Sequence, residues 1–71
     1  LEEGIEVLEN AVAALPEGRA MLVELGELYV AAGDRRSAAD AFRRALASRQ
    51  RAPNAEALDQ RAREGLDRIS Q

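Results

Sequence analysis

The chain has 71 residues and a formal net charge of -3. It contains neither cysteine nor histidine, which excludes a disulfide framework, a thiolate metal site, a cysteine nucleophile and an imidazole base. A core of this size supplies only about 3–5 kcal/mol of stability, and no apolar run approaches the roughly 20 residues of a membrane span. Because the chain starts at Leu1, we expect it to be a piece of a longer protein, and the sequence leaves its localisation unknown.

The first predicted element is an amphipathic helix that ends near Leu15. Ile5, Leu8 and Val12 recur at steps of three and four residues, which places them on one face of a helix. Pro16 cannot continue the helical hydrogen bonding. The acidic residues of this segment lie mostly off the apolar stripe, so the pattern predicts one buried face and one solvated face.

A second helix is predicted from Gly18 to Ala32. Its apolar residues surround nearly the whole circumference, which is typical of a helix that packs on several sides. Gly33 follows it and favours the left-handed conformation that commonly ends a helix. We therefore expect this helix to lie in the middle of the molecule.

Two further helices are predicted in the second half of the chain. Asp34 is a candidate cap for a helix over 35–49, and Asn54, after Pro53, is a candidate cap for a fourth helix. The expected inward residues of the fourth helix are Leu58, Ala62, Leu66 (or Gly65) and Ile69. Because short breaks join all four helices, the sequence predicts an all-α fold of stacked antiparallel helix hairpins.

The chain also aligns on itself at an offset of 34 residues. Gly4 then faces Ala38 and Leu8 faces Phe42, so that small residues meet small ones and large apolar residues meet large ones. An offset of 34 is the period of one helix-turn-helix repeat of the tetratricopeptide kind. We therefore interpret the chain as part of a repeat array.

The residues that carry this resemblance are Leu22, Leu25, Gly26, Tyr29, Gly33, Asp34, Ala38, Phe42 and Ala45. They resemble a complete tetratricopeptide repeat, except that Leu22 stands where tryptophan is usual and the closing proline arrives three residues late at Pro53. The resemblance implies one domain over 1–71. Residues 1–16 would be the second half of a preceding repeat, 19–53 a complete repeat, and 54–71 a closing helix or the start of another repeat. The late proline predicts either a third helix longer by about one turn or a longer loop.

The resemblance further implies a concave binding groove on the second helix. Its candidate partner-binding residues are Ala20, Val23, Glu24, Glu27, Val30 and Ala31. Such a groove would suit a peptide with an apolar or basic residue. In the alternative interpretation, neighbouring helices bury Val23 and Val30 and leave no groove.

Arginine residues form a second candidate surface. Arg35, Arg36, Arg43 and Arg44 lie on one predicted helix, and we consider them a candidate anion-binding patch. The alternative is a solvated face, in which exposed ion pairs contribute about 0–1 kcal/mol each. The chain has one tyrosine and one phenylalanine, both assigned to the core, so no platform remains on which nucleic-acid bases could stack.

The functional hypothesis is a protein-protein interaction module, a fragment or end of a larger scaffold that binds a peptide or partner protein. The runner-up is a structural spacer or self-association element, with Ile5, Leu8 and Val12 as candidate contacts because their helix lacks its paired repeat. We expect no enzymatic activity, no catalytic residue, no metal and no cofactor, because the serines have no histidine or lysine base anywhere in the chain.

Overall fold

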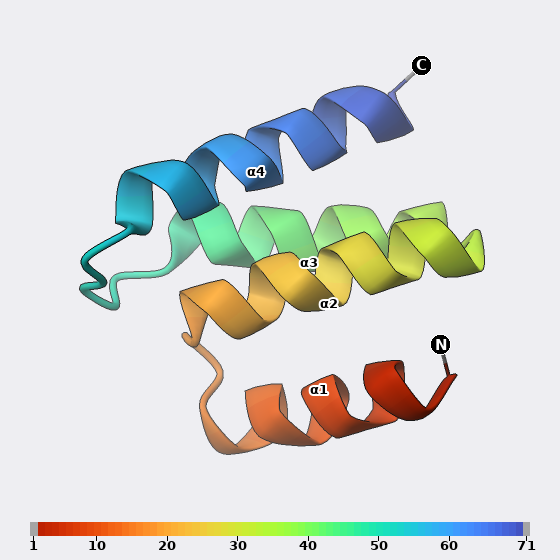
Figure 1. Ribbon diagram of the computed structural model, residues 1–71, viewed down its shortest axis with the longest axis horizontal. Coiled ribbons are helices and arrows are strands. Elements are labelled where there is room, and N and C mark those ends of the chain that lie inside the picture. Colours follow the sequence, from red (N-terminus) through yellow and green to blue (C-terminus); the bar gives the residue numbers. More distant parts are fainter. Residues whose placement is uncertain (1, 71) are drawn as a thin grey trace.

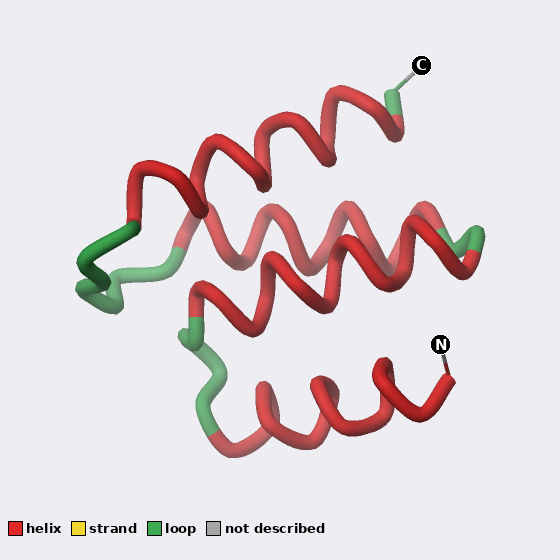
Figure 2. The backbone as a smooth tube through the Cα atoms, in the orientation of Figure 1, coloured by secondary structure: helices red, strands yellow, loops and turns green. Residues whose placement is uncertain are grey.

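The computed structural model describes residues 2–70, which form an all-α stack of helix hairpins without a strand (Figures 1 and 2). The four helices in chain order are α1 (Glu2–Ala14), α2 (Arg19–Ala32), α3 (Arg35–Ala47) and α4 (Ala55–Ile69). This confirms the predicted fold class. Consecutive helices run in opposite directions, as short connections require (Figure 1).

The turn between α2 and α3 forms as its sequence predicts. Gly33 adopts the left-handed conformation with φ 83°, and its N–H donates to the Val30 carbonyl at 3.0 Å. The Asp34 N–H donates to the Tyr29 carbonyl at 2.9 Å, so two carbonyls at the end of α2 are satisfied. The Asp34 carboxylate then accepts from the Ser37 N–H at 3.1 Å. Hydrogen bonding to the Ser37 side chain, followed by this bond to its backbone, lowers the pKa of Asp34. The predicted Asp34 cap is therefore confirmed.

The connection between α3 and α4 departs from the predicted helix boundary. α3 ends at Ala47 rather than at Arg49, so the late proline lengthens the loop and not the helix. Ser48 has extended backbone angles, and its hydroxyl donates to the Glu17 carbonyl at 2.6 Å. Asn54 stands at the cap position of α4 but its side chain makes no capping hydrogen bond, so that expectation is wrong. Its φ of -109° and ψ of 29° differ from the extended conformation that a capping side chain normally needs.

A buried arginine ties this long loop to the rest of the molecule. Arg19 is 9% exposed, and its guanidinium donates to the Ser48 carbonyl at 2.7 Å. Its Nε lies 3.7 Å from a carboxylate oxygen of Asp59 on α4. The start of α2, the loop and α4 are therefore held together at one end of the stack.

The hydrophobic core is centred on α2, which packs against all three other helices, while α3 also packs against α4. This confirms the predicted central position of α2. Phe42 is fully buried at the junction of α2, α3 and α4, where its ring lies against two glycines. A Cβ atom on Gly26 would come within 2.6 Å of this ring, and one on Gly65 within 2.3 Å. The absence of side chains at these two positions lets both helices close on the same ring.

Candidate interaction groove

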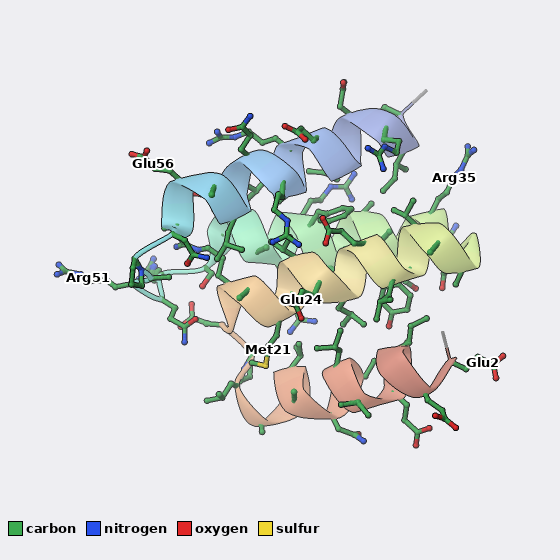
Figure 3. All side chains as sticks on the ribbon, viewed as in Figure 1. Glu2, Met21, Glu24, Arg35, Arg51 and Glu56 are labelled. Carbon is green, nitrogen blue, oxygen red and sulfur yellow. The ribbon has the colours of Figure 1, made fainter. Side chains whose placement is uncertain are left out.

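α4 packs over part of the predicted groove on α2 and leaves a pocket of about 80 Å³ that Glu27 and Val30 line. Val23 is 0% exposed and belongs to the same core cluster as Leu58 and Ala62 of α4. The expectation that Val23 lines an open groove is therefore wrong, and for this residue the alternative of a covering helix holds. Val30 is half-buried against the same core, whereas Ala20, Glu24 and Ala31 are exposed. Glu24 is labelled on α2 in Figure 3.

Glu27, also predicted to face the groove, is paired with α4. Its two carboxylate oxygens accept from Nε and Nη2 of Arg61 at 3.2 and 2.5 Å, a bidentate arrangement. The hydrogen bond to Glu27 raises the pKa of Arg61. Each side chain is 45% exposed, so the pair lies at the surface, where such pairs contribute about 0.2–1 kcal/mol. Glu27 therefore links α2 to α4 instead of standing free for a ligand.

An open groove lies instead between α1 and α3, which do not pack on each other. It has a volume of about 400 Å³, and α2 forms its floor. The wall from α1 contributes Glu9, Val12 and Ala13, and the floor from α2 contributes Leu25 and Tyr29. The wall from α3 contributes Arg36, Ser37, Asp40, Ala41 and Arg44. We call this surface the α1–α3 groove.

Tyr29 and Glu9 join the floor of the groove to its α1 wall. The Tyr29 hydroxyl donates to a carboxylate oxygen of Glu9. Burial, followed by this hydrogen bond and the negative charge of Glu9, raises the pKa of Tyr29 to about 12. The phenol is therefore neutral at any physiological pH and acts as a hydrogen-bond donor.

The four arginines of the predicted anion patch do not form one surface. Arg36 and Arg44 line the α1–α3 groove, whereas Arg35 and Arg43 lie outside it, and all four are exposed. Figure 3 shows Arg35 extending away from the helices. Sequence reasoning missed the division, although the spacing of residues 36, 40 and 44 already places them in one row along a helix.

The candidate self-association residues on α1 face inward. Val12 is 4% exposed, and Ile5 and Leu8 are half-buried against the core. α2 of the same chain covers Val12 and covers Ile5 and Leu8 in part, so the expectation that Val12 lacks cover is wrong. The large apolar side chains that remain exposed within residues 2–70 are Val7 and Leu15, at 66% and 57%.

No family model, curated protein or solved structure matches the chain. Within residues 2–70, no helix is long and apolar enough to cross a bilayer. Over the same residues, no group of three or more acidic side chains is placed to hold a metal ion.

Proposed function

We propose that the chain is a protein-interaction module of the tetratricopeptide kind that binds a partner polypeptide in the α1–α3 groove. The observation that carries the proposal is the groove itself, which has buried apolar residues at its base and charged residues, among them Glu9, Arg36 and Arg44, along its walls. Sites that bind polypeptides typically join apolar contact with a few hydrogen-bonding groups that fix the register. The packing of Phe42 on Gly26, and the complete burial of Ala38 and Ala45, support the repeat-like character of α2 and α3.

The distribution of exposed apolar residues supports the placement of this module at the end of a larger scaffold. Both large exposed apolar side chains in residues 2–70, Val7 and Leu15, lie on or just after α1. The outward residues of α4 are polar or small, as expected for a helix that closes an array and faces water. Residues 54–71 therefore fit a closing helix better than the start of a further repeat.

The function is tested by selecting peptides that bind the chain from a display library of random peptides. The variant Ala13→Trp places a bulky ring on the α1 wall of the groove, and Ala13 is exposed, so the core is not disturbed. The matched control is Ala14→Trp, which adds the same ring to the neighbouring exposed residue outside the groove. We expect enriched peptides to bind the parent and Ala14→Trp alike, and to bind Ala13→Trp at least about tenfold more weakly.

Two results would overturn the proposal. One is the failure of the library to yield any peptide that binds the folded parent. The other is equal binding to the parent and both tryptophan variants, because the peptides would then contact a different surface.

A second function, self-association, is favoured by the exposure of Val7 and Leu15. A second copy that covered these side chains would remove apolar surface from water, at about 25 cal/mol per Å². Analytical ultracentrifugation of the parent beside Val7→Asp/Leu15→Asp tests this function. A dimer that the double variant abolishes supports it, whereas a folded parent that stays monomeric at millimolar concentration rules it out.

A further inference from the structure

We infer that the α1–α3 groove selects an acidic peptide segment, whose carboxylates pair with Arg36 and Arg44 while an apolar side chain reaches the floor. The inference rests on the proposed function, because it names the chemistry of the polypeptide that the groove takes. It concerns the face formed by α1 and α3, which differs from the α2 surface that α4 covers.

The first support is the spacing of the two arginines along the α3 wall. Arg36 and Arg44 both line the groove, with Asp40 one turn from each. Eight residues of helix separate their Cα atoms by about 12 Å. Each guanidinium offers a planar fork of donors that matches a carboxylate. Two acidic side chains of one short segment can therefore reach both arginines at once.

The second support is the pairing state of the charges around the groove. The ion pairs within residues 2–70 join Arg61 to Glu27 and Arg19 to Asp59. Arg36 and Arg44 take part in neither, and on the α3 wall they outnumber the single acid Asp40. Across the groove, one oxygen of Glu9 already accepts from Tyr29. An acidic segment that lies along the α3 wall gains two partners, whereas a basic segment would find its partners in Glu9 and Asp40, one on each wall.

The third support is the small amount of apolar surface at the base of the groove. Val12 of the α1 wall, Leu25 of the floor and Ala41 of the α3 wall are each at most 4% exposed, so they offer a ligand little apolar surface. One apolar side chain of a segment can contact this base, and the remaining contacts must be polar. The selectivity of the groove therefore comes from the arginines more than from apolar burial.

The experiment measures binding of fluorescent twelve-residue peptides by anisotropy. One peptide alternates glutamate with leucine and alanine, a second replaces every glutamate with glutamine, and a third replaces every glutamate with lysine. The test variant is Arg36→Ala/Arg44→Ala. Its matched control, Arg35→Ala/Arg43→Ala, removes the same charge, at the same spacing, from positions on α3 outside the groove. Circular dichroism verifies that both variants keep the helical content of the parent.

We expect the acidic peptide to bind the parent at least about tenfold more tightly than the glutamine and lysine peptides, because two exposed ion pairs together supply about that factor. Arg36→Ala/Arg44→Ala should weaken binding about tenfold, and the control pair less than about twofold. Added salt should weaken binding of the acidic peptide and leave binding of the glutamine peptide nearly unchanged.

Three results would overturn the inference. If the two double variants weaken binding equally, the chain attracts anions through its overall positive potential on α3 and not through the groove. An oligonucleotide should then compete as well as the acidic peptide. If the glutamine peptide binds as tightly as the acidic one, charge does not select the ligand. If library selection yields groove-dependent peptides without acidic residues, the inference fails while the proposed function stands.

Discussion

The two sides of α2 are packed in different ways. On one side, α2 and α4 close on the fully buried ring that α3 contributes through Phe42, because Gly26 and Gly65 let their backbones approach it. On the other side, α1 lies against α2 alone (Figure 1). Val12, at 4% exposed, is the one buried residue of α1, and Val7 stays exposed. The difference predicts that α2, α3 and α4 form the more stable unit and that α1, which is held by one helix, is the first to detach on unfolding. The α1–α3 groove lies along this boundary.

The largest expected effect comes from removing the ring at the centre of the stable unit. Phe42→Ala should cost about 3–5 kcal/mol, because it leaves a cavity lined by three helices. That equals the whole stability expected of a chain of this size, so the variant should be largely unfolded. Far-ultraviolet circular dichroism with urea titration measures the loss. Cooperative unfolding at the parent's urea midpoint would show that Phe42 does not organise the core.

A smaller effect on stability is expected from adding a methyl group at a glycine, either on α4 beside the Phe42 ring or on α1. Gly65→Ala places a carbon 2.3 Å from the Phe42 ring, which is enclosed and cannot move aside. Overpacking should outweigh the gain in helix propensity and destabilise the chain by about 1–2 kcal/mol. Gly4→Ala on α1 is the matched control, since its new carbon would meet only the end of the Leu28 side chain at 3.3 Å. It should be neutral or stabilising by up to about 1 kcal/mol, as read from thermal unfolding.

Val12→Ala tests whether α1 is held less firmly than the other three helices. Removing two buried methyl groups should cost about 1–2 kcal/mol, and the loss should fall on α1. Amide hydrogen exchange is the measurement: the amides of α1 should exchange faster, while those of α2, α3 and α4 keep their protection. Uniform acceleration through all four helices would mean that the chain unfolds as one unit and that α1 is no weaker than the rest.

The smallest effect is a shift in titration. Tyr29 is the chain's one tyrosine, so ultraviolet absorbance of the phenolate reports its pKa directly, expected at about 12 against an ordinary value of 10.0. Because the folded state holds this proton more tightly, the contribution of Tyr29 to stability is complete below pH 10 and is lost as the pH rises to about 12. Glu9→Gln removes a negative charge from the contact and should lower the pKa. If Tyr29 had the same pKa in the parent and in Glu9→Gln, α1 would not lie against Tyr29 in solution.

The local features of the fold were predictable because their causes are local. Gly33 and Asp34 end one helix and start the next through hydrogen bonds within a few residues, and the sequence pattern indicates both. The boundary of α3 was not predictable, because it ends where Ser48 bonds to Glu17, a residue far away in the chain. Asn54 shows the same limit, since a residue type favoured at a cap does not guarantee the backbone angles that a cap needs.

The candidate site was harder to predict than the fold, because it depends on how helices lie against one another. The apolar circumference of α2 predicts packing on several sides, but it does not say which neighbouring helix buries Val23. The α1–α3 groove likewise cannot be predicted from either helix alone. The row of Arg36 and Arg44 was readable from the sequence, but its importance depends on the open space beside it.

The long loop between α3 and α4 has a consequence for proteolysis. The chain has no lysine, so trypsin can cut only after arginine, and every arginine apart from Arg49 and Arg51 lies within a helix. The backbone of Arg49 is tethered to Glu17, which leaves the bond after Arg51 as the most accessible to the protease. Trypsin should therefore cut the chain first between α3 and α4. The two fragments should stay associated, because α4 of one fragment packs on the Phe42 ring of the other.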